Sequence, residues 1–218
     1  MPYSAVFFDM DGTVLDTLAD LHAATNAALR HFGYPERSLD EVRRFVGNGS
    51  RRLMELALPA GSPAEVVEAA LQWYKPWYNA HAAVLTRPYD GIPALLARLK
   101  AAGRPVAILS NKPDATVRAL AARFFPGLYT LAAGEDEAHG RRRKPCPDLL
   151  LSAAEALSLP PQKCLYVGDS EVDVLTARRA GMDCASVLWG FRSREELEAA
   201  GASRFFASPE ALGDFILP

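Results

Sequence analysis

Residues 5–13 read AVFFDMDGT, so four apolar residues are followed at once by two aspartates two positions apart and then by a glycine. A short apolar run bounded by turn residues is typical of a buried strand. Side chains at i and i+2 of an extended segment point to the same side, so Asp9 and Asp11 can converge on one bound group. Two ionised carboxylates this close repel each other, which favours a divalent cation, protonation of one carboxylate, or separate roles as nucleophile and acid/base. The alternative is an acidic turn that only ends a strand.

Length and composition exclude several classes of protein. The 218 residues suffice for one large domain or two modest ones, and half of them are hydrophobic with a net charge of -2. This composition argues against disorder and against a polycationic nucleic-acid surface, so we expect no nucleic-acid partner. Three widely spaced cysteines without a C-x-x-C pair indicate a reducing compartment. With no leader-like segment and no apolar run near the roughly 20 residues of a bilayer span, we expect a cytoplasmic protein without a membrane partner.

From about residue 88 onward, short apolar runs alternate with amphipathic segments. This alternation predicts an α/β fold built on a parallel sheet. The predicted strands after the first one cover residues 106–109, 164–167 and 185–188. The predicted helices cover residues 92–100 and 114–125, and two more begin at a Ser193/Glu196 capping box and at Ser208-Pro209.

Residues 17–87 behave differently, because helical periodicity dominates and no strand pattern is evident. One helical face carries Leu18, Leu21, Leu29 and Phe32 and ends at Gly33. Further helices are predicted over residues 39–46, 50–57 and 64–80. We therefore expect an α/β catalytic core at 1–16 and 88–218, interrupted after its first strand by a helical cap at 17–87.

Polar clusters follow the predicted strands or lie in the loops beside them. Ser110 and Asn111 end the strand at 106–109, Lys144 lies in a later loop, and Asp169 and Asp173 follow the strand at 164–167. Ligands of open parallel sheets bind at the carboxyl ends of the strands, so these clusters should converge. A carboxylate nucleophile, a hydroxyl, an amide, a cation and further carboxylates together suit a phosphoryl group with a hard metal ion.

Each cluster also has a purely structural interpretation when taken alone. Ser110-Asn111 could be a helix-start turn, and Lys144 follows three arginines in what could be a solvated basic run. Asp169 and Asp173 could complement a helix dipole. Their joint occurrence in this order at strand ends favours the functional interpretation.

Together these motifs resemble those of the haloacid dehalogenase-like (HAD) phosphatase superfamily over the full length of the chain. The first motif, D-x-D-G-[TV], matches residues 9–13, and the fourth, G-D-x-x-x-D, matches residues 168–173. The second and third motifs match Ser110 and Lys144. The resemblance implies a Rossmann-like (HAD-like) core, and the helical insert resembles the C1-type cap of that superfamily.

The resemblance also implies roles for these residues. Asp9 would be the nucleophile and Asp11 the general acid/base. Mg²⁺ would be bound by Asp9, the main-chain carbonyl of Asp11 and Asp169, with Asp173 assisting directly or through water. The phosphate would be bound by Gly12, Thr13, Ser110, Asn111 and Lys144, and Lys144 would also serve catalysis. The partner would be a small phosphorylated metabolite.

Single residues test the branches of the superfamily. Dehalogenases lack the second carboxylate of the first motif, which is present here as Asp11. A phosphonatase needs a cap lysine, and the lone lysine of 17–87 is Lys75, far from the expected place. Phosphomutases similar to β-phosphoglucomutase usually carry Val at the position of Thr13 and a cap histidine one position before His22.

The closest similarity is to phosphoglycolate phosphatases, carried by residues 8–21, 47–49, 87–91 and 110–113. It implies hydrolysis of 2-phosphoglycolate. We also expect a monomer or weak homodimer. A phosphatase for another small metabolite (a sugar phosphate or pyrophosphate), a β-phosphoglucomutase-like phosphomutase and a non-catalytic regulatory module stay open as alternatives. Asn48, Arg51 and Arg52, in a cap turn that opens a helix, are expected to bind the distal carboxylate of the substrate. The alternative there is a solvated arginine pair.

Overall fold

The computed structural model describes residues 3–136 and 140–217. The chain divides into two compact units, one formed by Met1–Leu15 with Pro88–Pro218 and the other by Asp16–Arg87. Among the described residues, no helix is both long enough and apolar enough to cross a membrane.

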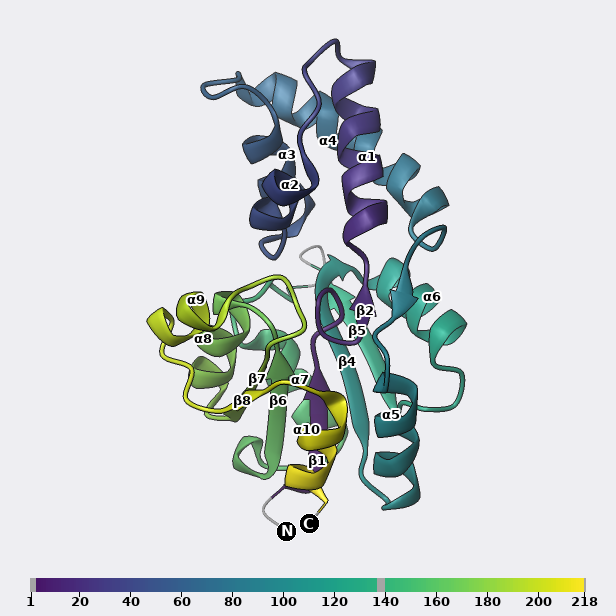
Figure 1. The fold of residues 1–218 in the computed structure, drawn as a ribbon, viewed down its shortest axis with the longest axis vertical. Helices are drawn as coiled ribbons and strands as arrows, with labels where there is room; N and C mark the ends of the chain where they lie inside the picture. The colour runs from purple at the N-terminus through teal and green to yellow at the C-terminus, as the bar shows by residue number, and fades with distance from the viewer. Residues whose placement is uncertain (1–2, 137–139, 218) are drawn as a thin grey trace. The chain divides into compact units, whose positions relative to one another are not determined.

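A six-stranded parallel sheet forms the centre of the larger unit (Figure 1), in the order β5-β4-β1-β6-β7-β8. Its strands are β1 (Ala5–Phe8), β4 (Val106–Pro113), β5 (Leu131–Glu135), β6 (Cys164–Gly168), β7 (Asp183–Val187) and β8 (Phe205–Phe206). The predicted α/β fold with a parallel sheet is thereby confirmed.

The central strands are buried throughout, which explains their continuous apolar sequences. In β1, Phe7 lies in register between Ala107 of β4 and Tyr166 of β6, and every residue of β1 is buried. Parallel sheets covered on both faces require such runs rather than an alternation of apolar and polar residues. β4 extends four residues beyond the predicted strand, so that its last half carries the polar residues 110–112.

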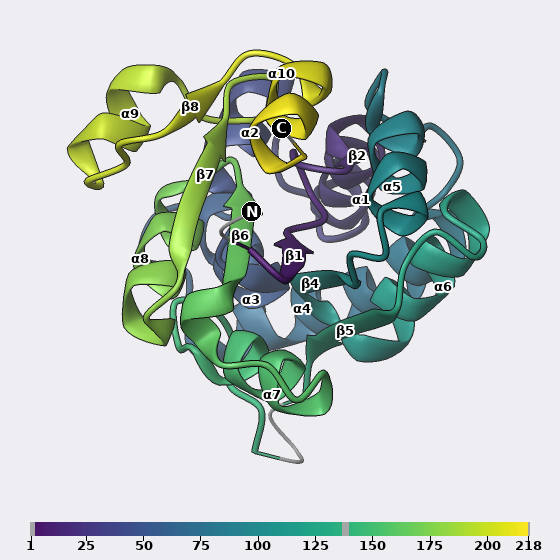
Figure 2. The ribbon, with the colours of Figure 1, turned by 90° about the horizontal axis from the view of Figure 1, so that it is seen from below.

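Helices cover both faces of the sheet (Figure 2). One face packs against the apolar sides of α7 and α8, while α5, α6 and α10 lie on the other side. The helices of this unit are α5 (Ile92–Ala101), α6 (Asp114–Phe124), α7 (Asp148–Ala156), α8 (Glu171–Ala180), α9 (Arg194–Ala199) and α10 (Pro209–Ile216), with a 3₁₀ turn at Pro161–Lys163. The predicted capping box of Ser193 is present, and Ser208 caps α10 by accepting from the Ala211 N–H.

The second unit is helical, with α1 (Leu18–His31), α2 (Leu39–Phe45), α3 (Gly49–Ala57) and α4 (Ala64–His81). These helices begin and end within two residues of the predicted ones. Two short strands, β2 (Leu15–Asp16) and β3 (Arg87–Pro88), form a separate two-stranded sheet. β2, β3, β5 and β8 were not predicted, because two residues give no periodicity and the sequence LAAGE of β5 has low β-propensity.

A single buried carboxylate organises the segment that follows α4. Asp20 is 3% exposed and accepts hydrogen bonds from the backbone N–H groups of Val84, Leu85 and Thr86 at 2.8–3.1 Å. The three N–H groups lie outside any helix or strand. Asp20 therefore supplies the acceptors that regular secondary structure would otherwise provide.

We predict that Asp20→Ala lowers the free energy of unfolding by about 1.5–3 kcal/mol, because it leaves these donors without a charged acceptor. Glu36→Ala is the matched control, since Glu36 lies at the surface and its ion pair with Arg30 is exposed. Urea titration followed by circular dichroism measures both variants. Equal destabilisation by the two substitutions would contradict the role of Asp20.

Candidate active site

Three neighbouring strands bring the predicted polar residues to one edge of the sheet. β1 lies between β4 and β6, and the three run parallel, so their carboxyl ends are adjacent. Asp9 follows β1, Ser110 lies in the last half of β4, and Asp169 follows β6. The chain adds β4 on one side of β1 and later β6 on the other, which makes this edge a topological switch point where ligands bind.

The ammonium group of Lys144 is the centre of the site. Its Nζ lies 2.6 Å from Asp9 Oδ1, 2.7 Å from Asp173 Oδ1 and 2.9 Å from the Tyr166 hydroxyl. All four side chains are buried. An ammonium has three N–H donors, and these contacts match that number. Lys144 thereby fixes the position of the Asp9 carboxylate.

Asp173 serves the fold and the site at once. Its Oδ2 accepts from the Ser170 N–H at 3.1 Å and from the Ser170 hydroxyl at 2.6 Å, and its own N–H donates to Ser170 Oγ at 3.4 Å, which completes the capping box of α8. Its Oδ1 accepts from Lys144 and from the Tyr166 hydroxyl, the latter at 2.9 Å. Asp173 thus lies in the first turn of α8, as its structural interpretation expects, and this position does not exclude membership of the site.

Asp169 is held in a tight backbone cradle. Its Oδ1 accepts from the Thr13 hydroxyl at 3.1 Å, and its Oδ2 accepts from the Phe191 N–H at 2.7 Å. A Cβ added at Gly12 or at Gly190 would lie 2.3 Å from an atom of the Asp169 side chain. Gly12 also has a φ of +81°, which favours glycine at that position. Both glycines are needed for the close approach of the backbone to this carboxylate.

Asp11 faces a second lysine. Lys112 Nζ lies 2.9 Å from Asp11 Oδ1, and the Ser110 hydroxyl lies 3.5 Å from Asp11 Oδ2. The Lys112 side chain is 7% exposed and that of Asp11 is 14% exposed. The two aspartates of the first motif are thus held by different lysines.

Asn111 connects the end of β4 to the loop that carries Lys144. Its side-chain amide donates to the Lys144 carbonyl at 3.0 Å, and its side-chain oxygen accepts from the Lys144 N–H at 2.7 Å. These bonds position Lys144. A direct contact of Asn111 with phosphate stays a prediction.

Most of the buried charged groups of the site are carboxylates, and their burial and mutual repulsion shift the pKa values of Asp9 and Asp169. Burial raises the pKa of Asp9 well above its usual range, and nearby carboxylates raise it further while Lys144 opposes them. Burial and the charge of Asp173 raise the pKa of Asp169 to about 7. Burial lowers the pKa of Lys144, but Asp173 and Asp9 outweigh that effect and raise it overall, so the ammonium stays charged at neutral pH.

The acidic residues fit a divalent cation. Asp9, Asp169 and Asp173 each offer a carboxylate oxygen, and these atoms lie within 4.8 Å of one another. Hard cations such as Mg²⁺ prefer oxygen ligands, and three buried carboxylates beside one ammonium leave an excess of negative charge. The residues present therefore suit the metal that the sequence predicts.

The predicted cap residues belong to the helical unit and have partners there. Arg51 forms an ion pair with Glu68, and Arg52 forms one with Glu55 at 3.0 Å. Asn48 is exposed just before α3. These five residues lie at the surface of the helical unit. Binding of a carboxylate by Asn48, Arg51 and Arg52 stays a prediction.

Sequence reasoning assigned no role to three parts of the site. Tyr166 lies inside a buried apolar strand. Because a buried tyrosine hydroxyl usually has a hydrogen-bond partner, this hydroxyl could have indicated a polar contact there. Lys112 directly follows the polar pair Ser110-Asn111, and a lysine at a strand end was a usable signal. The Phe191 contact is made by the backbone N–H, which no side-chain pattern reveals.

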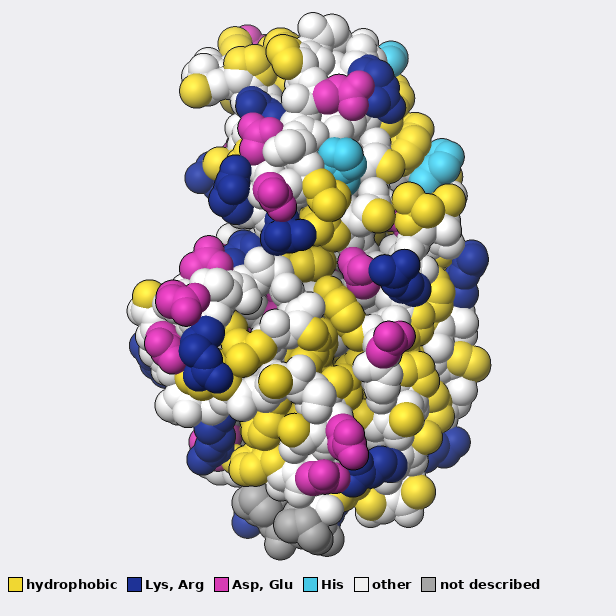
Figure 3. Space-filling view, in the orientation of Figure 1, with side chains coloured by type: hydrophobic (Ala, Val, Ile, Leu, Met, Phe, Trp, Pro, Cys, Tyr) yellow, Lys and Arg dark blue, Asp and Glu magenta, His cyan; other side chains and the backbone are white. Residues whose placement is uncertain are grey.

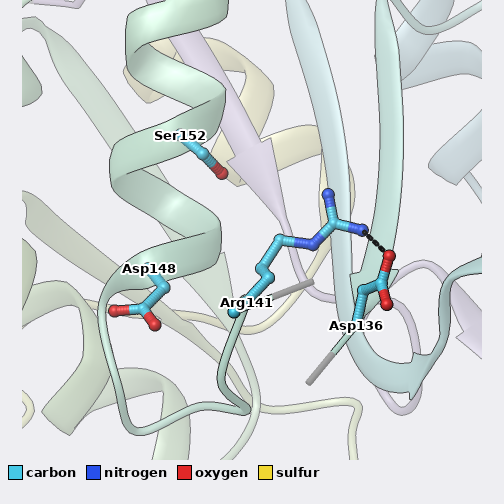
Figure 4. Close-up of a pocket in the computed structure, with 5 residues that line it drawn as sticks. Asp136, Arg141, Asp148 and Ser152 are labelled. Carbon is cyan, nitrogen blue, oxygen red and sulfur yellow. Dashed lines mark ion pairs between the residues drawn. The ribbon is translucent and has the colours of Figure 1, made fainter. Parts of the chain in front are cut away.

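A hollow of about 320 Å³ is lined by Asp136, Gly140, Arg141, Asp148 and Ser152 (Figure 4). Arg141 is ion-paired there, at 3.8 Å from Asp136 and 2.8 Å from Asp114. None of the predicted catalytic residues lines this hollow. On the face shown in Figure 3, acidic and basic side chains are interspersed.

A comparison with protein families shows to which family this chain belongs. Residues 3–181 match the family model of the haloacid dehalogenase-like hydrolases. The chain belongs to that family. The family membership predicted from the four motifs is therefore confirmed.

The individual relatives of this hydrolase compared below are named as phosphatases. It is 35% identical over 218 residues to the N-acetylmuramic acid 6-phosphate phosphatase of Pseudomonas aeruginosa, covering 99% of this chain and 96% of that protein. It is 37% identical over 193 residues to phosphoglycolate phosphatase 1 of the same organism, covering 85% of this chain and 70% of that protein. A crystal structure of a candidate phosphoglycolate phosphatase from Lactobacillus delbrueckii subsp. bulgaricus has a TM-score of 0.94 and 36% identity, covering 100% of this chain and 99% of that one.

We predict that Mg²⁺ raises the midpoint of thermal unfolding of this hydrolase, because a ligand that binds only the folded state stabilises it. At 100 times the dissociation constant the gain is about 2.7 kcal/mol, which corresponds to several degrees for a chain of this size. Asp169→Asn should remove most of the shift, since the amide keeps the shape but not the charge. Asp214→Asn, on the exposed surface, should keep it. An equal shift in Asp169→Asn and wild type would contradict the metal site.

Proposed function

We propose that this hydrolase is a Mg²⁺-dependent phosphomonoesterase that acts through an aspartyl phosphate on Asp9. The observation that carries the proposal is the buried Asp9 carboxylate, held at 2.6 Å by Lys144 beside a second aspartate at the carboxyl edge of the sheet. A fixed carboxylate next to a fixed cation suits attack on a dianionic phosphate. The cation offsets the repulsion between nucleophile and substrate.

In the first step, an oxygen of Asp9 forms a bond to phosphorus and the bond from phosphorus to the leaving oxygen breaks. Asp11 gives its proton to that oxygen, so an alcohol leaves rather than an alkoxide. Lys144 and the Ser110 hydroxyl stabilise charge on the phosphoryl oxygens. Thr13 and Gly12 contribute by shaping the turn beside Asp169.

In the second step, Asp11 accepts a proton from water as the water oxygen bonds to phosphorus. The bond between phosphorus and Asp9 breaks, and phosphate is released with Asp9 regenerated. One residue thus serves as acid and then as base. Positioned proton transfer supplies about 10²–10⁴-fold in rate, so electrostatic stabilisation by the surrounding cations must supply more.

The metal would be held by Asp9 and Asp169, with Asp173 nearby and with the main-chain carbonyl of Asp11 as the further ligand that the family resemblance implies. Mg²⁺ bound there would supply positive charge to the transferring phosphoryl group. Both oxygens of Asp173 already accept hydrogen bonds from the protein, which supports an assisting role through water.

The substrate we propose is 2-phosphoglycolate. The motifs of residues 8–21 and 110–113 support it, as do several relatives named phosphoglycolate phosphatase that are 33–37% identical. N-acetylmuramic acid 6-phosphate is the second candidate, since the relative with that name aligns along 99% of the chain. We further propose a cytoplasmic protein, supported by the free thiols of Cys146, Cys164 and Cys184, and a monomer or weak homodimer.

The substrate proposal is tested by phosphate release from a panel of phosphomonoesters with Mg²⁺, ranked by kcat/KM. The panel contains 2-phosphoglycolate, N-acetylmuramic acid 6-phosphate, a hexose 6-phosphate and ethyl phosphate, with pyrophosphate added. We expect 2-phosphoglycolate to rank first. A preference for N-acetylmuramic acid 6-phosphate would replace the first candidate by the second.

We predict that Asp9→Asn abolishes turnover, because an amide oxygen is a far weaker nucleophile than a carboxylate. The fold should persist, since the amide keeps the shape and can still accept from Lys144. Phosphate release measures activity, and circular dichroism verifies the fold. A folded Asp9→Asn protein with wild-type activity would exclude Asp9 as the nucleophile.

We predict that joint substitution of Asn48, Arg51 and Arg52 by Ala lowers the ratio of kcat/KM for 2-phosphoglycolate to that for ethyl phosphate. The reason is the loss of cationic and amide donors for the substrate's carboxylate. Arg44→Ala, an exposed arginine of α2, is the control. An unchanged ratio in the triple variant would refute a role for the cap turn.

A further inference from the structure

Lys112 is a second buried cation that the proposed reaction does not use. Its Nζ lies 2.9 Å from Asp11 Oδ1, and its side chain is 7% exposed. Its backbone is fixed as well, because its N–H donates to the Ser110 hydroxyl at 3.2 Å and a Cβ at Gly134 would lie 2.3 Å from its carbonyl oxygen. A lysine is seldom buried without a partner of opposite charge. The cation is therefore held in place beside Asp11.

We propose that Lys112 is a specificity-determining residue. It favours phosphomonoesters in which a carboxylate is bonded to the carbon that carries the leaving oxygen. The inference rests on the proposed function, because that function places the leaving oxygen at Asp11. It adds a donor from the sheet unit to the recognition of the substrate's acid group, beside the donors of the cap turn proposed above.

The position of Lys112 follows from that of Asp11. A group that gives its proton to the leaving oxygen must come within about 2.6–3.2 Å of it. Since Lys112 Nζ lies 2.9 Å from the same Asp11 carboxylate, the ammonium stands beside the first atoms of the leaving group. In 2-phosphoglycolate the carboxylate carbon is two bonds from the leaving oxygen. Its oxygens can therefore reach the ammonium.

One ammonium can hold two carboxylates at once, as Lys144 does in this site with Asp9 and Asp173 at 2.6 and 2.7 Å. Lys112 can thus bind the carboxylate of the substrate while it keeps Asp11. A carboxylate has two acceptor oxygens, so a contact with Lys112 leaves room for a second donor. Charge-assisted hydrogen bonds in a buried site are stronger than neutral ones.

The same geometry separates the two substrate candidates. In N-acetylmuramic acid 6-phosphate the carboxylate belongs to a lactyl ether on another carbon of the ring, many bonds from the phosphate ester. The first atoms of this substrate beyond the leaving oxygen are uncharged, so they form no charge-assisted hydrogen bond with the Lys112 ammonium. Lys112 therefore favours a short 2-phospho acid over a sugar 6-phosphate.

The test compares 2-phosphoglycolate with ethyl phosphate, in which a methyl group replaces the carboxylate. Phosphate release gives kcat/KM for both esters in the wild type, in Lys112→Met and in the control Lys163→Met, an exposed lysine at the amino end of β6. We expect the ratio of the two values to fall about 10- to 100-fold in Lys112→Met, the loss of one charge-assisted hydrogen bond. The ratio should not change in Lys163→Met.

An equal loss for both esters would overturn the proposal, because it would mean that Lys112 only positions Asp11. An unchanged ratio would overturn it as well. If Lys112→Met does not fold, as judged by circular dichroism, Lys112→Gln is measured in its place with the same expectation. A wild-type protein that releases phosphate from neither ester would instead refute the proposed function, which is a separate outcome.

Discussion

The ion pair between the Lys144 ammonium and the Asp9 carboxylate is the interaction on which the site depends. Both groups are buried, and the same ammonium also holds Asp173 and the Tyr166 hydroxyl. Removal of one member of such a pair leaves an uncompensated buried charge, which costs about 3–5 kcal/mol. The loop that carries Lys144 therefore has to close onto the sheet edge, and Asn111 holds its backbone there.

Much of this arrangement could be predicted from the sequence, because its determinants are local. The buried run Ala5–Phe8 predicts a central strand, and the polar residues after it and after β4 and β6 predict a shared edge. The helices of residues 17–87 follow from apolar periodicity, and Ser193 and Ser208 mark helix starts through their own side chains.

The rest could not be predicted, because it depends on contacts between distant segments. The Tyr166 hydroxyl accepts from Lys144, which lies in a loop 22 positions earlier, and the Phe191 N–H reaches Asp169 across 22 positions of sequence. The Lys112–Asp11 pair spans about half the chain and follows from the pairing of β1 with β4. Strand order creates these contacts, and periodicity does not encode strand order.

The central claim is that Asp9 carries the phosphoryl group during turnover. Its most direct test is to quench the enzyme in acid during hydrolysis of 2-phosphoglycolate, reduce it with borohydride and sequence the peptide of residues 5–13 by mass spectrometry. An acyl phosphate on Asp9 is reduced to homoserine, so the account predicts homoserine at position 9. Unmodified Asp9 in a sample that was releasing phosphate, with homoserine at another aspartate, would contradict it.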